Sequence, residues 1–224
     1  MTKHLQRDLA QIHREVLSLS ARVEDMIDMA ARSLRERRHD LADEVSALDN
    51  EVDQQEVNIE EECLKILALH QPVAVDLRRV ATVLKANNDL ERMADLAVNI
   101  ARRGRDVGDF PEFDIPPRLA PMVTEVKQMV HSALDAFVKL DTNAARKVIE
   151  SDNEVDRLNM EIINELQDMM IENSHLVVPA LHCFSAVRHL ERIADLATNL
   201  AEDVIYLTQG EIIRHQTKAT EMTR

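Results

Sequence analysis

The sequence predicts an all-α protein made of two tandem three-helix bundles, six long helices in all, related by internal duplication. Only three glycines and six prolines occur in 224 residues, so long stretches contain no helix breaker. Aromatic residues make up 2 % of the chain and Trp is absent. The core must therefore consist of Leu, Ile, Val, Met and Ala, which fill helix interfaces. The two halves of the chain also repeat each other.

The first two helices form a predicted hairpin at the N-terminal end of the chain. Apolar residues recur at helical spacing through residues 4–37, which predicts the first helix. Asp40 is a candidate N-cap for a second helix that runs to His70. Gln71 and Pro72 then mark a turn.

The third helix is predicted over residues 73–103, where two arginines and Gly104 come in the order expected of a helix C-terminus. The next stretch, residues 106–121, holds four of the six prolines together with Gly108, a composition typical of a linker. We therefore expect the first three-helix repeat in residues 1–105 and the linker in residues 106–121.

The second half is predicted to contain three further helices, over residues 122–140, 142–172 and 178–209. Asp141 is a candidate N-cap for the middle one, and Gly210 is a candidate stop for the last. These helices make up the second repeat, residues 122–210. Residues 211–224 are expected to be a flexible tail.

The repeat is visible in two motifs. The motif DNEVD at residues 49–53 recurs at residues 152–156, which is 103 positions later. The motif LERMADLA at residues 90–97 recurs as LERIADLA at residues 190–197, which is 100 positions later. The difference of three residues falls in the turn between helices, where changes of length are tolerated. Both halves therefore share one helical register.

Each repeat carries two acidic pairs at i and i+4, a spacing that puts both carboxylates on one face of a helix. If the second and third helices of each repeat form an antiparallel hairpin, the four carboxylates of that repeat lie level, beside the helix interface. The two hairpin turns are expected at residues 71–72 and 173–174. The eight acidic residues are Asp49, Asp53, Glu91 and Asp95 in the first repeat, and Asp152, Asp156, Glu191 and Asp195 in the second.

Four level carboxylates repel one another and lose solvation, so their charge requires compensation. A divalent or trivalent cation supplies it directly, and ligation by oxygen alone favours Fe, Mn or Mg over soft metals. Two other arrangements would need no metal: arginine or lysine from a neighbouring helix could neutralise the carboxylates, or the carboxylates could point into solvent. Because the paired pattern occurs twice, we predict that the eight carboxylates are metal ligands.

Charge and composition exclude several classes of function. A formal net charge of −14 repels nucleic acid and leaves no basic face for an anionic membrane, so any membrane association is at most peripheral. The N-terminus lacks the apolar segment of a signal peptide, which predicts a cytoplasmic protein. Cys63 and Cys183 are expected to be buried, reduced thiols. No glycine-rich phosphate loop, nucleophile elbow or Cys/His cluster occurs, so no enzyme activity is expected.

Three segments resemble the PhoU family of phosphate-signalling proteins: residues 90–100 (LERMADLAVNI), their copy at 190–200, and residues 71–79 (QPVAVDLRR). The resemblance extends over nearly the whole chain. It implies two three-helix bundles that bind metal through Glu/Asp-x-x-x-Asp motifs, in some members as multi-iron clusters, and these motifs match the eight acidic positions. The family usually has Gly before the Asp of the motif, where this chain has Ala94 and Ala194. That departure removes no ligand.

The resemblance also implies a function that helical periodicity does not supply. It predicts a cytoplasmic homodimer that acts as a negative regulator of phosphate transport and of the phosphate-starvation response, the Pho regulon. Its implied partners are the phosphate ABC transporter and a sensor histidine kinase. Two alternatives stay open. A carboxylate-rich metal-storage protein would need Glu-x-x-His pairs on facing helices, and these are absent; a helical adaptor would function without metal.

Overall fold

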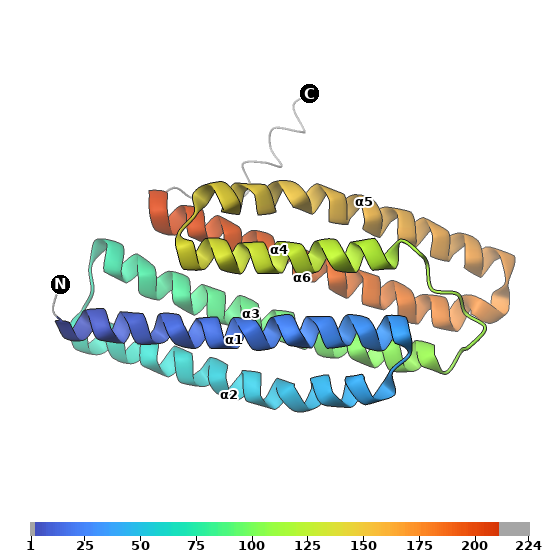
Figure 1. Cartoon of the computed structure of the whole chain (residues 1–224), viewed down its shortest axis with the longest axis horizontal. Coiled ribbons are helices and arrows are strands. Elements are labelled where there is room, and N and C mark those ends of the chain that lie inside the picture. Colours follow the sequence, from blue (N-terminus) through green and yellow to red (C-terminus); the bar gives the residue numbers. More distant parts are fainter. Residues whose placement is uncertain (1–2, 211–224) are drawn as a thin grey trace, which may run out of the picture.

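The computed structural model describes residues 3–210 and confirms the all-α fold with two three-helix bundles (Figure 1). The first bundle contains α1 (Lys3–Glu36), α2 (His39–His70) and α3 (Ala74–Gly108). The second contains α4 (Leu119–Lys139), α5 (Thr142–Glu172) and α6 (Val177–Gln209). A short 3₁₀ helix, η1 (Ser174–Leu176), lies in the α5–α6 turn, where the sequence predicts a turn. The predicted tail, residues 211–224, lies outside the described residues.

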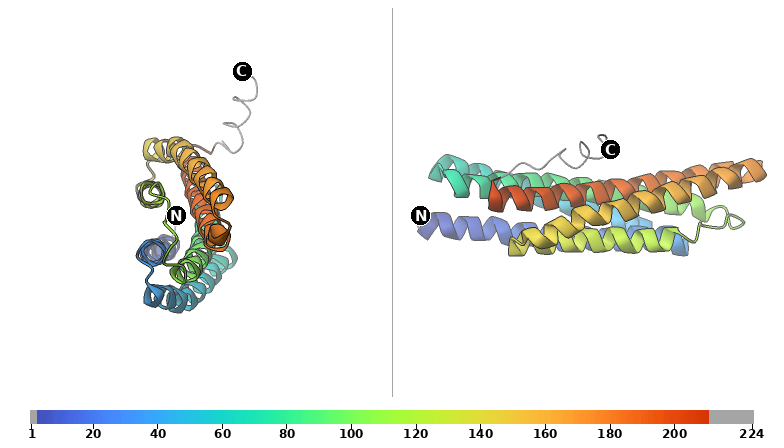
Figure 2. Two further views of the ribbon diagram at one scale, coloured as in Figure 1. Left: turned by 90° about the vertical axis from the view of Figure 1, so that its right-hand side faces the viewer. Right: turned by 90° about the horizontal axis from the view of Figure 1, so that it is seen from above.

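The two bundles pack side by side and run in opposite directions. In the end-on view, α2, α3, α6 and α5 form one curved layer, and α1 and α4 lie against its inner side (Figure 2). The α2–α3 and α5–α6 turns therefore lie at opposite ends of an elongated molecule (Figure 1). Buried side chains from all six helices form one continuous hydrophobic core. The fold thus places the two acidic hairpins in one layer, one on each side of the α3–α6 contact.

Several predicted helix ends are confirmed by their local geometry. Asp141 is the N-cap of α5, and its side chain accepts hydrogen bonds from the backbone N–H groups of Asn143 and Ala144. Gly210 ends α6 in the left-handed conformation, with φ of 74°. Gln71, which follows α2, is also left-handed, and its N–H donates to the carbonyl of Leu67.

The predicted end of the third helix is wrong. Helix α3 continues through Gly104 to Gly108, and α4 begins at Leu119, so the connecting segment is residues 109–118 and not 106–121. Gly104 is buried where α3 crosses α1, and a Cβ atom there would lie 2.7 Å from the backbone N of Leu34. Close helix packing, and not helix termination, therefore accounts for this glycine.

Asp40 is not the N-cap of α2. The helix begins one residue earlier, at His39, and Arg38 holds the cap position. The reason is that Arg37 adopts the left-handed conformation, with φ of 54°, and so reverses the chain within two residues. Asp40 lies in the first turn, where its carboxylate accepts hydrogen bonds from Arg38, which lower the pKa of Asp40 to about 2.

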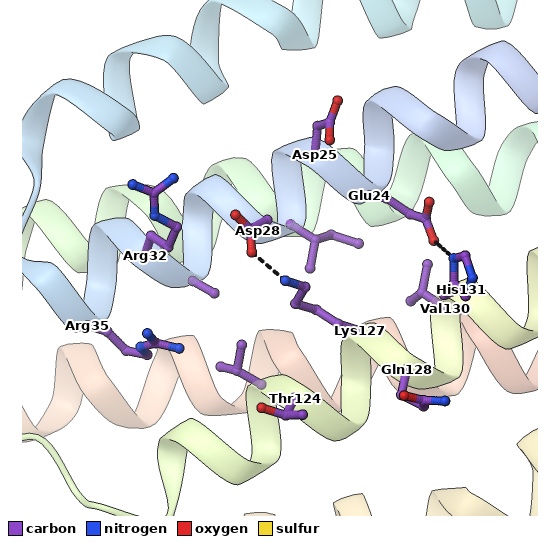
Figure 3. A pocket seen from close by; sticks show the side chains of 13 residues that line it. Glu24, Asp25, Asp28, Arg32, Arg35, Thr124, Lys127, Gln128, Val130 and His131 are labelled. Atoms are coloured by element: carbon purple, nitrogen blue, oxygen red, sulfur yellow. Dashed lines mark hydrogen bonds and ion pairs between the residues drawn. The ribbon is translucent and has the colours of Figure 1, made fainter.

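A cleft of about 600 Å³ separates α1 from α4, and two polar contacts cross it (Figure 3). Lys127 of α4 donates to Asp28 of α1, and His131 lies 2.9 Å from Glu24. At the offset of 103 residues, Glu24 corresponds to Lys127 and Asp28 to His131. The internal duplication has therefore diverged so that α1 supplies acids and α4 supplies bases at equivalent positions.

The α3–α6 contact carries a further ion pair between the bundles. The Lys85 ammonium on α3 donates to Oδ1 of Asp203 on α6 over 2.9 Å, and it lies 5.2 Å from the centre of the Tyr206 ring. The Asp203 side chain is 2 % exposed, whereas that of Lys85 is 43 % exposed. This pair joins the two repeats at their buried interface.

Candidate metal centre

The structure brings the four predicted carboxylates of the first repeat together along the seam where α2 packs on α3. Asp49 and Asp53 lie on α2, and Glu91 and Asp95 lie on α3. Burial raises the pKa of Asp49, and the charges of Asp53 and Asp95 raise it further. The pKa of Glu91 is also raised, first by burial and then by Asp95 and Asp53. The two acidic pairs therefore face each other, as the hairpin geometry predicts.

The second repeat reproduces this arrangement between α5 and α6. Asp152 and Glu191 are half-buried, like Asp49 and Glu91 in the first repeat, whereas Asp156 and Asp195 are exposed, like Asp53 and Asp95. Burial raises the pKa of Glu191, followed by the charge of Asp195, and the charge of Asp156 adds to the increase. The eight predicted residues thus form two equivalent acidic rows, one along the α2–α3 seam and one along the α5–α6 seam, which we name the first and the second groove.

The two grooves differ in their basic neighbours. In the second groove, Nη1 of Arg188 donates to Oε1 of Glu191 over 3.2 Å, and its charge opposes the increase in the pKa of Glu191. The corresponding residue in the first repeat, 100 positions earlier, is Asn88. In the first groove, Arg102 lowers the pKa of Asp49, but less than burial and the two acidic neighbours raise it. Arginine therefore supplies part of the compensation, and more of it in the second groove.

The donor atoms suit a hard cation. Oδ1 of Asp49 and Oε2 of Glu191 are buried and have no hydrogen-bond partner within residues 3–210, so each groove holds a carboxylate oxygen with an unused lone pair. However, no three His, Cys, Asp or Glu side chains of that range are gathered tightly enough to enclose an ion. The carboxylates line the grooves without converging on one point, and their role as ligands stays a prediction.

Sequence reasoning missed an extension of the first acidic row. Glu56 lies one turn beyond Asp53 on α2, and burial together with Glu60 and Asp53 raises its pKa. Asn87 on α3 donates to the backbone carbonyl of Glu56 over 2.9 Å and to its Oε1 over 3.1 Å. Residues 49, 53, 56 and 60 lie on one face of α2, because they are three or four positions apart. This spacing could have been recognised in the sequence.

The two cysteines have no visible part in the acidic rows. Cys63 and Cys183 are buried and form no disulfide, and burial raises the pKa of each thiol to about 12. Both cysteines are therefore buried thiols, as predicted. Within residues 3–210, no helix is both long and apolar enough to cross a membrane.

Comparison with known proteins identifies the family. The PhoU domain matches residues 16–104 and again residues 119–204, so that each match coincides with one of the two bundles. The chain belongs to the PhoU family. The crystal structure of PhoU from Pseudomonas aeruginosa superposes with a TM-score of 0.88 at 35 % sequence identity, covering 92 % of this chain and 99 % of that one. The family resemblance read from the LERMADLA motif and its copy is confirmed.

Curated relatives of this PhoU family member cover nearly the full chain. The phosphate-specific transport system accessory protein PhoU homolog of Deinococcus radiodurans is 38 % identical over 94 % of this chain and 99 % of its own length. The phosphate-specific transport system accessory protein PhoU of Escherichia coli is 31 % identical over 93 % of this chain and 86 % of its own. Membership in this family supports a role in the regulation of phosphate transport.

Proposed function

We propose that the chain is a metal-binding negative regulator of phosphate transport and of the phosphate-starvation response. The observation that carries this proposal is the match to PhoU accessory proteins over nearly the whole chain, in both repeats. The chain acts in the cytoplasm, as a homodimer, through contacts with the phosphate ABC transporter and the sensor histidine kinase. Activity by contact is consistent with the absence of a catalytic motif from the sequence.

The two acidic grooves are the proposed metal sites. Asp49, Asp53, Glu91 and Asp95 would hold a cation in the first groove, and Asp152, Asp156, Glu191 and Asp195 in the second. The raised pKa values of half-buried carboxylates and their unpartnered oxygens support a cation of the Fe, Mn or Mg class. Such an ion would neutralise the repulsion and connect the two helices of each hairpin.

Elemental analysis tests the metal sites directly. The protein is purified without chelator or metal-binding tag, as the native chain and as the double variant Asp95→Asn/Asp195→Asn. We expect the double variant to contain less metal at unchanged helix content, because one ligand is lost from each groove. The control is Glu44→Gln/Glu150→Gln, which removes two exposed acids that lie outside the rows. Equal metal content in all three proteins would contradict the ligand assignment.

A reporter of phosphate-starvation genes tests the regulatory role. A strain that lacks this protein, and any second copy of such a gene, is expected to express the reporter even in phosphate-rich medium. The native chain should restore repression, and a chain with Glu91, Asp95, Glu191 and Asp195 neutralised should not. Normal repression in the uncomplemented strain would refute the regulatory role. Full activity of the neutralised chain would favour the metal-free adaptor, and altered iron tolerance without a reporter effect would favour metal storage.

A further inference from the structure

The open side of α1 carries a stripe of six side chains that are alternately three and four positions apart. This is the spacing of a seam between two packed helices. The six residues are exposed or half-buried: Ser18, Ala21, Asp25, Asp28, Arg32 and Arg35. The last four line the cleft between α1 and α4, and Figure 3 shows them along one stretch of α1. The stripe therefore has the pattern of a helix contact, although it is open to solvent.

The charges of this stripe form two halves of opposite sign. The acids Asp25 and Asp28 come first, and the bases Arg32 and Arg35 follow. Suppose that the α1 helices of two copies lie antiparallel about a two-fold axis midway between Asp28 and Arg32. Asp25 of each copy then faces Arg35 of the other, and Asp28 faces Arg32, so every facing pair in the stripe has opposite charge. A parallel arrangement would instead place each charge beside its own copy.

The two outermost charges of the stripe are available for such a contact. The side chains of Asp25 and Arg35 are exposed, and neither makes a hydrogen bond or an ion pair within residues 3–210. Asp28 and Arg32 each make an ion pair inside the chain, but their side chains remain 39 % and 41 % exposed. All four charges can therefore accept a partner from a second molecule.

The internal duplication does not account for this pattern. At the offset of 103 residues, the four charged positions of the stripe become Gln128, His131, Asp135 and Val138 on α4. The equivalent face of α4 therefore has no division into an acidic and a basic half. The self-complementary pattern belongs to α1 alone.

The overall charge of the chain favours a locally balanced surface for any contact between two copies. Each copy has a formal net charge of −14, so two copies repel each other as whole molecules. The stripe holds two acids and two bases, and its antiparallel pairing brings no like charges together. A second copy of this chain is thus the partner whose charges match those of the stripe.

We propose that this stripe is the interface of the homodimer, in which the α1 helices of two copies lie antiparallel about a two-fold axis between Asp28 and Arg32. The inference rests on the proposed homodimer and names its surface, and it does not depend on metal in the acidic grooves. Each exposed pair contributes little energy by itself, but the reciprocal set fixes the direction and the register of the two helices.

Analytical ultracentrifugation of two charge-reversed variants tests this interface. Asp25→Arg and Arg35→Asp each place two pairs of like charge in the dimer, so each variant alone should dimerise about tenfold or more weakly than the native chain. In an equimolar mixture, position 25 of one variant and position 35 of the other again carry opposite charges, in both directions. The mixture should therefore dimerise like the native chain, and the native dimer should weaken in high salt.

The controls are Asp168→Arg and Lys147→Asp, which make the same changes of net charge at exposed positions on α5 and should leave dimerisation unchanged. A native chain that stays monomeric up to about 100 μM would overturn both the homodimer and this interface. A native dimer that neither reversal weakens would refute the interface and leave the homodimer standing. Variants that are monomeric alone and stay monomeric when mixed would refute the pairing of Asp25 with Arg35.

Discussion

Replacing Gly104 by Ala should destabilise the protein, although it removes a glycine from the interior of a helix. At an exposed helical position this change stabilises by about 1 kcal/mol, because Ala has the higher helix propensity. At Gly104, however, the new Cβ would lie 2.7 Å from the backbone N of Leu34 and 2.9 Å from its Cα. The obstacle is the backbone of α1, which cannot rotate away as a side chain can.

The size of the effect follows from that geometry. Ordinary contact begins at 3.4 Å, so α1 would have to move away from α3 by about 0.7 Å at this point. Ser33, Leu34 and Ala101 are all fully buried there, and α1 is packed against α2 and α4 as well. Overpacking of this kind costs about 1 to 3 kcal/mol, and a backbone clash belongs at the upper limit. After the gain in propensity, we expect a net loss of about 2 kcal/mol.

Thermal unfolding followed by circular dichroism measures this loss, with chelator present so that bound metal does not differ between samples. A loss of about 2 kcal/mol should lower Tm by about 4 to 8 °C in a chain of this size. Gly108→Ala is the matched control, because its Cβ would be closest to the ring Nε2 of His39, which is the movable end of a side chain. We expect Gly108→Ala to leave Tm nearly unchanged. The reasoning fails if Gly104→Ala melts at or above the native temperature.

Three further predictions concern charge. Lys85→Met should destabilise the chain by about 2 to 3 kcal/mol in chemical denaturation, because it leaves the buried Asp203 carboxylate without its ammonium partner; an effect below about 0.5 kcal/mol would contradict the role of this pair. In chelator at about pH 7, Asp95→Asn should be more stable than the native chain, because the raised pKa values of Asp49 and Glu91 mean that their ionised forms oppose folding. This difference in stability between Asp95→Asn and the native chain should disappear as the pH falls toward 3.8 and 4.5, the ordinary pKa values of Asp and Glu. A stability difference that grows in acid would contradict the prediction. Calorimetric titration with Mn²⁺ should show that Asp95→Asn loses more affinity than Asp195→Asn, because Arg188 already occupies an oxygen of the second groove; the reverse order would contradict this.

The sequence alone predicts the helices and the placement of the acidic rows. Helical spacing of apolar residues and the repeat at 103 and 100 positions are properties of the chain, so six helices and two equivalent hairpins could be inferred without coordinates. The level arrangement of Asp49 with Asp95 and of Asp53 with Glu91 follows because a hairpin turn sets the register of both helices. The caps at Asp141 and Gly210 were predictable for the same reason, since they depend on local chemistry.

Only the tertiary structure decides the features that depend on how separate helices approach one another. Gly104 has the pattern of a helix stop in the sequence, but contact with the backbone of Leu34 explains it, and no local rule reports that contact. The same is true of the pair between Lys85 and Asp203 and of the cleft between α1 and α4, which exist only because the two bundles pack against each other. Local patterns determine helices because the interactions that form a helix join residues close together in the sequence, whereas packing joins residues that lie far apart, such as Lys85 and Asp203, 118 positions apart.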